Sequence, residues 1–230
     1  MIETSEIENT CEFCQKTFKK ATTLGSHICP KKNRWVARHQ KNSIIGFSAW
    51  QQFYASGFSS MKTRTIEDFI HSPYYAAFTR FGTYCMDAQV LNIPRYIDWL
   101  LKEQVKIDDW NKDTKYSKFL MGYLRTEDPL DAVARSIENM IRLAEAENIP
   151  TSDYLRLTNP NKICHEITTG KISPWALFQS DSGVQFLSNL NADQERMITP
   201  YIDPTQWAIK FIRDPKTASE IREILSAAGF

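Results

Sequence analysis

The chain has 230 residues, of which 42% are hydrophobic and 12% aromatic, and its formal net charge at pH 7 is +1. This composition is typical of a globular protein with a sizeable core and argues against wholesale disorder. No apolar run reaches the roughly 18 residues of a membrane helix, and the opening MIETSEIENT is acidic and polar, unlike a secretory signal. We therefore expect a cytoplasmic protein without membrane contact.

The first forty residues are unevenly charged. An acidic tail contains Glu3, Glu6 and Glu8. Between residues 10 and 41 there are a single acidic residue, Glu12, and eight basic ones. These are Lys16, Lys19, Lys20, Lys31, Lys32, Arg34, Arg38 and Lys41. A basic segment in a nearly neutral protein indicates an anionic partner for that segment, and we expect nucleic acid, with DNA favoured over RNA.

Residues 1–32 contain a metal-binding pattern. Cys11 and Cys14 are three positions apart, and His27 follows at the spacing C-x2-C-x3-F-x5-L-x2-H, with Phe18 and Leu24 at the two apolar positions. Two such cysteines can present both thiolates to one tetrahedral ion. The segment resembles a Cys2His2-type zinc finger, which implies a small ββα fold around one structural Zn²⁺.

The fourth ligand departs from that family, because Lys31, Lys32 and Asn33 stand where a second histidine is expected. Cys29 is the nearest donor. On a continuous helix it would point about 200° away from His27, but Pro30 disfavours helical geometry at the preceding residue. The helix should therefore stop near Ile28 and let Cys29 complete a Cys-Cys-His-Cys set, with His39 as the alternative donor.

The resemblance also implies base contacts. In fingers that read DNA, the residue before the helix and the third and sixth helical residues meet base edges. These positions correspond to Lys20, Thr23 and Ser26, with Thr22 beside them. One finger reads only about three base pairs, so the remaining basic residues would supply sequence-independent affinity for phosphates. The alternative is that the lysines are a solvated face and the finger docks on a protein.

Residues 33–57 are expected to form a basic connecting helix. The stretch from Arg34 to Ser56 spaces apolar residues such as Trp35, Ile45 and Trp50 among polar ones, and Gly57 ends it.

Residues 58–230 are expected to form an α-helical domain of about eight to ten short helices. A polar residue followed by proline, typical of a capped helix start, recurs at Ser72-Pro73, Asp128-Pro129, Asn159-Pro160, Ser173-Pro174, Asp203-Pro204 and Asp214-Pro215. Strand signals are poor, so the predicted fold class is mainly α: a ββα finger followed by a multi-helix bundle. The stretch 149–161 is interpreted as a loop inside this domain, with a boundary between two subdomains as the alternative.

No catalytic pattern stands out, since the chain lacks a glycine-rich phosphate loop and HEITTG lacks the second histidine of a zinc-protease helix. The segments FIHSPYYAAFTRFGTYC, IPRYIDWLLKE and ISPWALFQSDSGVQFL resemble uncharacterised finger-headed helical proteins of large tailed bacteriophages. The resemblance implies a phage protein working in the cytoplasm of a bacterial host.

The sequence therefore predicts a non-enzymatic nucleic-acid-binding accessory protein for phage replication, transcription or packaging. Its helical domain would engage a protein partner. A protein-interaction adaptor is the alternative, and an unrecognised nucleic-acid enzyme is a third possibility.

Overall fold

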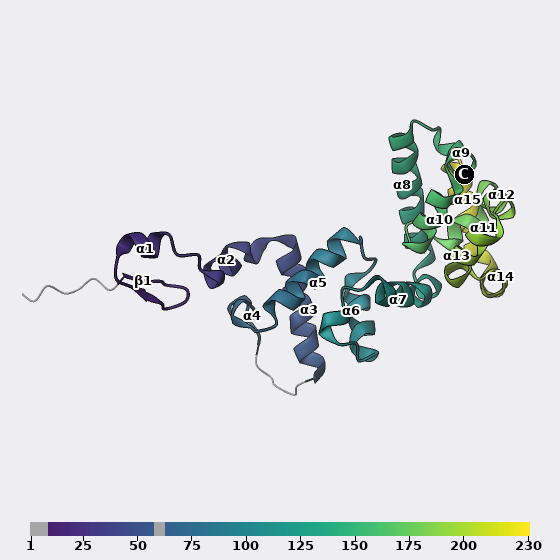
Figure 1. Cartoon of the computed structure of the whole chain (residues 1–230). Coiled ribbons are helices and arrows are strands. Elements are labelled where there is room, and N and C mark those ends of the chain that lie inside the picture. The colour runs from purple at the N-terminus through teal and green to yellow at the C-terminus, as the bar shows by residue number, and fades with distance from the viewer. Residues whose placement is uncertain (1–8, 58–62) are drawn as a thin grey trace, which may run out of the picture. The chain divides into compact units, whose positions relative to one another are not determined.

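The computed structural model describes residues 9–57 and 63–230 and confirms the mainly α fold class (Figure 1). A two-stranded antiparallel hairpin, β1 (Asn9–Thr10) and β2 (Thr17–Phe18), is followed by α1 (Ala21–Gly25), which completes a small ββα unit. Fifteen α-helices lie in the described residues. Within that part of the chain, no helix combines the length and apolarity needed to cross a membrane.

The chain divides into two compact units, Met1–Asn111 and Lys112–Phe230. The stretch 149–161, whose alternative interpretation is a subdomain boundary, lies inside the second unit. There it forms the 3₁₀ helix η3 (Thr151–Asp153), the short helix α9 (Tyr154–Leu157) and the start of α10 (Pro160–Thr168).

The first unit begins with the finger and continues through a broken helix. The interval 33–57, expected to be one connecting helix, holds the end of α2 (Pro30–Val36), the 3₁₀ helix η1 (Ala37–His39) and α3 (Lys41–Gly57). Gln40 separates the last two with an extended ψ of 144°. Neither glycine nor proline marks this break, and the spacing of apolar residues continues across it. The sequence therefore contains no sign that the helix is interrupted.

Helix α3 crosses α5 (Tyr75–Asp87) at very short range, and two glycines make this possible. A Cβ atom at Gly82 would lie 2.0 Å from the carbonyl oxygen of Asn42, and one at Gly46 would lie 2.6 Å from that of Phe78. The other elements of this unit are α4 (Ile66–His71), α6 (Ile93–Lys102) and the 3₁₀ helix η2 (Ile107–Asp109).

The core of the first unit is aromatic. Trp110 is fully buried, with Phe78 and Phe81 edge-on to its ring at centroid distances of 5.5 and 5.3 Å. Its indole nitrogen donates to the carbonyl of Val105 at 2.9 Å, and its own carbonyl accepts from the Tyr96 hydroxyl at 3.2 Å. Tryptophan is therefore buried here without losing its polar contact.

The second unit is entirely helical in the described residues. Besides α9 and α10 it contains α7 (Asp113–Thr126), α8 (Pro129–Glu147), α11 (Pro174–Gln179), α12 (Asp181–Ser188), α13 (Ala192–Ile202), α14 (Pro204–Arg213) and α15 (Pro215–Ala227). Twelve α-helices thus follow α3 in the described residues, more than the eight to ten expected, because short helices such as α9 and α11 have too few turns to show a periodicity.

Proline starts five of these helices as predicted. Asp128, Asn159, Ser173, Asp203 and Asp214 are N-caps whose side chains accept backbone amides, and each is followed by proline at the first helical position. The prediction was wrong at Ser72-Pro73. Ser72 ends α4 by donating its amide to the Phe69 carbonyl, and α5 starts only at Tyr75.

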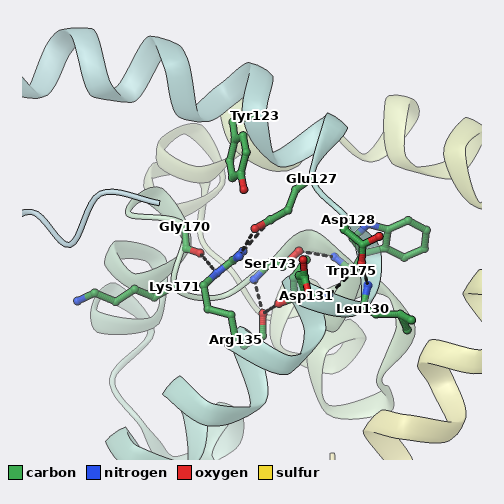
Figure 2. Close-up of polar contacts among 12 residues, drawn as sticks. Tyr123, Glu127, Asp128, Leu130, Asp131, Arg135, Gly170, Lys171, Ser173 and Trp175 are labelled. Carbon is green, nitrogen blue, oxygen red and sulfur yellow. Dashed lines mark hydrogen bonds and ion pairs between the residues drawn. The ribbon is translucent and has the colours of Figure 1, made fainter. Parts of the chain in front are cut away.

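A buried polar network joins α8 to the loop before α11 (Figure 2). Arg135 donates to both carboxylate oxygens of Glu127 and, through Nε, to the Gly170 carbonyl at 3.0 Å. One residue further along α8, Ser136 Oγ accepts the Ser173 amide at 2.8 Å. Because these contacts join groups largely removed from water, the network fixes the loop on the helix.

Candidate metal centre

The β-hairpin presents the two cysteines of the first pair. The amide of Cys11 donates to the Lys16 carbonyl at 2.9 Å, and its carbonyl accepts the amide of Gln15 at 2.8 Å. Gln15 has the left-handed φ of 62° that such a tight turn requires. The turn brings Cys14 back beside Cys11 at the end of β1.

His27 and Cys29 come from the segment between α1 and α2. Helix α1 ends at Gly25, earlier than the expected stop near Ile28, and the His27 amide closes a turn on the Leu24 carbonyl at 3.1 Å. Cys29 is extended, with φ −100° and ψ 110°, and Pro30 is the first residue of α2. Cys29 therefore stands outside a helix as predicted, with the extended backbone that proline favours at the preceding residue, although α1 has already ended four residues earlier.

The four side chains converge on one point. The ligand atoms of Cys11, Cys14, His27 and Cys29 all lie within 4.8 Å of one another, and Cys14 Sγ is 3.3 Å from His27 Nε2. Cys11 and Cys29 are 6% and 2% exposed. Ligand atoms of a tetrahedral zinc ion stand about 3.5–4 Å apart, given metal–ligand distances of about 2.0–2.3 Å. The cluster can therefore hold a metal ion.

The pKa values of the Cys11 and Cys14 thiols are shifted in opposite directions. Hydrogen bonding from the Cys14 amide holds the pKa of Cys11 below its ordinary value, although burial opposes this. The pKa of Cys14 is raised: the Lys16 amide lowers it, but burial and the neighbouring Cys11 and Cys29 thiols outweigh that contact. The neighbouring thiols thus oppose the ionisation of Cys14, and a bound cation would remove the conflict.

A small apolar layer supports the ligands. The Phe18 ring lies 4.8 Å from the His27 ring, centroid to centroid, and Lys16 Nζ lies 5.6 Å above Phe18. Phe18 and Leu24 are only half-buried. Residues 9–29 therefore lack a core large enough to fold without further stabilisation.

The lysines of the basic segment are exposed, as are the hydroxyl residues predicted to meet bases. The exposed set comprises Lys16, Lys19, Lys20, Lys31, Lys32, Lys41, Thr22, Thr23 and Ser26. Helix α1 is only five residues long, so Ser26 falls on its C-cap, where its hydroxyl donates to the Thr23 carbonyl at 3.3 Å. His39, the alternative ligand, is exposed and is not part of the cluster.

Both arginines predicted to contact phosphates are engaged within the chain. Arg34 donates to the Ile70 carbonyl at 3.0 Å and lies 4.8 Å over the Tyr75 ring. Arg38 donates to the carbonyl of Trp35 at 2.7 Å and stacks on that indole at 4.0 Å. Sequence reasoning missed the role of Arg34 because its partners are at least 36 residues away along the chain and leave no local signal.

The chain matches no protein family, no curated protein and no solved structure.

Proposed function

We propose that this chain is a zinc-organised nucleic-acid-binding accessory protein without catalytic activity. The observation that supports the proposal most directly is the convergence of Cys11, Cys14, His27 and Cys29 inside a short segment that exposes Lys16, Lys19 and Lys20. In the described part of the chain, this is the one group of three or more His, Cys, Asp and Glu side chains that gathers its ligand atoms.

Zinc is the metal that the ligand set favours. Thiolates and imidazole in a four-ligand arrangement suit Zn²⁺, and four protein ligands leave no open position for water or substrate. The ion would hold residues 9–29 folded and supply no reactive group. Purified protein should contain one zinc per chain by elemental analysis, and Cys14→Ser should lose it. A wild-type protein without stoichiometric zinc would refute this proposal.

Nucleic acid is the partner that the charge favours. The five lysines of the finger and the first turn of α2 are exposed, and within the described residues no salt bridge involves them. Each phosphate contact that a variant removes should reduce the slope of log K against log salt by about 0.9 on duplex DNA. DNA is favoured over RNA. The short α1 favours binding through the phosphate backbone over reading of bases.

A charge-matched comparison tests this assignment. One variant replaces Lys16, Lys19, Lys20, Lys31 and Lys32 by Gln; the control replaces five basic residues that are exposed outside the finger, Arg95, Lys102, Lys106, Lys118 and Lys216. Fluorescence anisotropy is measured with DNA and RNA oligomers across a salt series. The first variant should lose much of its affinity, and its slope of log K against log salt should become shallower. Equal losses in both would reject the finger as the site.

The adaptor remains the second candidate because apolar side chains are exposed between His27 and Cys29 and at the end of α2. Ile28 and Val36 are 81% and 67% exposed, and such residues are enriched where proteins dock. A pull-down from the native host with and without nuclease separates the two functions. Loss of the captured material after nuclease supports nucleic acid, whereas retention of a specific protein supports the adaptor. Such a host pull-down also tests the proposed phage role in replication, transcription or packaging.

A further inference from the structure

Cys29 has two structural roles, one in the ligand cluster and one at the start of α2. It is one of the four potential metal ligands, and its Sγ is also the N-cap of α2, accepting the Lys32 amide at 3.4 Å. We propose that metal loading is coupled to the docking of α2 on α4 and α5, with Cys29 and Arg34 as the two ends of that coupling. This inference rests on the metal-binding part of the proposed function.

Helix α2 has little stability of its own. It has seven residues, and isolated helices shorter than about 12 residues are marginal in water. Its first turn contains no acidic residue, while Lys31 and Lys32 place positive charge at the positive end of the helix dipole. Its formation must therefore depend on contacts with groups outside the helix.

At the N-terminal end, the contact depends on the thiol of Cys29. A metal ion would fix the position of Sγ and so hold the acceptor of the Lys32 amide in place. An acceptor at this place satisfies an amide that has no partner within the helix. Without the ion, the Cys29 side chain is positioned only by its neighbours in the cluster, and hydrogen bonds to sulfur are weak.

At the other end, Arg34 attaches α2 to the helical part of the first unit. Its guanidinium donates to the Ile70 carbonyl, in the last turn of α4, at 3.0 Å. The last carbonyls of a helix lack intrahelical donors and form its negative end, which suits a cation. The same guanidinium covers the ring of Tyr75, the first residue of α5, which is 8% exposed.

The two contacts are joined by little more than one helical turn. Arg34 lies five positions after Cys29, a rise of about 7.5 Å along a helix. When the helix is formed, the position of one contact restricts that of the other. Coupling between two binding events is reciprocal, so the metal strengthens the docking of α2 by the factor by which docking strengthens metal affinity.

Arg34→Ala and Arg38→Ala form a matched pair for the test in the full-length protein. Both remove a stacked guanidinium from the same segment, but the contacts of Arg38 are to Trp35 of that segment. Zinc affinity is measured by competition with a chromophoric chelator. Arg34→Ala should weaken affinity about fivefold or more, within the usual range of such couplings, while Arg38→Ala should stay within about twofold of wild type.

Hydrogen exchange read by mass spectrometry supplies an independent measurement. Chelating the zinc should speed exchange in 30–36 and also in 66–71, while exchange in α15 of the second unit stays unchanged. Arg34→Lys keeps the charge and a donor but loses the planar stack, so its affinity should fall between wild type and Arg34→Ala. This variant keeps the test decisive if Arg34→Ala fails to fold.

Two results overturn the coupling. One is chelation that frees residues 9–29 while exchange in 30–36 and 66–71 remains as in the loaded protein. The other is a zinc affinity that is the same for wild type, Arg34→Lys and Arg34→Ala. Failure of the proposed function is distinguishable, because wild-type protein would then bind no stoichiometric zinc and the competition would have no baseline.

Discussion

Both carboxylate oxygens of Glu127 accept hydrogen bonds from Arg135, and the two side chains are only 3% and 18% exposed. Glu127 follows the last residue of α7 and Arg135 lies in the second turn of α8, so the ion pair closes the corner between these helices (Figure 2). Because Arg135 also holds the Gly170 carbonyl, three separate segments depend on one guanidinium.

Glu127→Gln should therefore destabilise the second unit strongly. Removing one partner of a buried ion pair leaves an uncompensated charge, which costs about 3–5 kcal/mol. The measurement is the free energy of unfolding in urea. Arg196→Gln is the control, since the Arg196–Asp193 pair is 77% and 84% exposed and such pairs contribute little. Equal effects of the two variants would contradict a stabilising role for the network.

Gly82→Ala should destabilise the first unit, because its Cβ would meet the Asn42 carbonyl oxygen at 2.0 Å and force α3 and α5 apart. Overpacking of this kind costs about 1–3 kcal/mol. Gly122→Ala in α7 places the same methyl group where nothing lies within 4 Å, and should stabilise by about 0.5–1 kcal/mol. Thermal unfolding of both variants checks the opposite signs. A neutral Gly82→Ala would show that α3 and α5 can separate at no cost.

Stability should fall in acid partly through Glu147. The hydrogen bond from Lys162, together with one from Thr158, holds the pKa of this carboxyl below its ordinary value of 4.5. A lowered folded-state pKa adds stability above the unfolded value, and that stability disappears as pH falls through the folded value. The free energy of unfolding should therefore decline below about pH 4.5. Glu147→Gln should flatten this decline, whereas Glu145→Gln, exposed on the same helix, should keep the wild-type profile.

The five cysteines should separate into two classes on alkylation. Burial raises the pKa of Cys85 to about 12 and also raises that of Cys164, so neither offers a reactive thiolate near pH 8. Mass spectrometry after iodoacetamide treatment should find both unmodified in folded protein. Cys11, Cys14 and Cys29 should react once the metal is chelated. Labelling of Cys85 before unfolding would contradict its burial.

The sequence predicts best what neighbouring residues determine. The spacing of Cys11, Cys14 and His27 places three ligand atoms together, and Cys29 joins them with the extended backbone expected before Pro30. A capping residue followed by proline locates five helix starts, because this pattern also acts within a few residues. Each of these features depends on backbone geometry within a few residues.

Long-range contacts account for what the sequence does not reveal. The division between Asn111 and Lys112 has no glycine or proline to mark it, and the engagement of Arg34 requires Ile70 and Tyr75 to be brought to it. At Ser72 the local pattern favours a helix start, yet the residue closes α4 instead. Neither Gly46 nor Gly82 shows in the sequence that another helix passes over it.

Cys29 is followed at once by Pro30, the first residue of α2, so the finger and the next helix have no spacer between them. Inserting a single residue at this junction would move the Lys32 amide away from the sulfur it contacts and rotate Arg34 by about 100° around the helix axis. An insertion or deletion at the end of the finger would therefore also disturb the contacts of α2. A graft onto another protein would have to extend at least through Tyr75 to keep both contacts together.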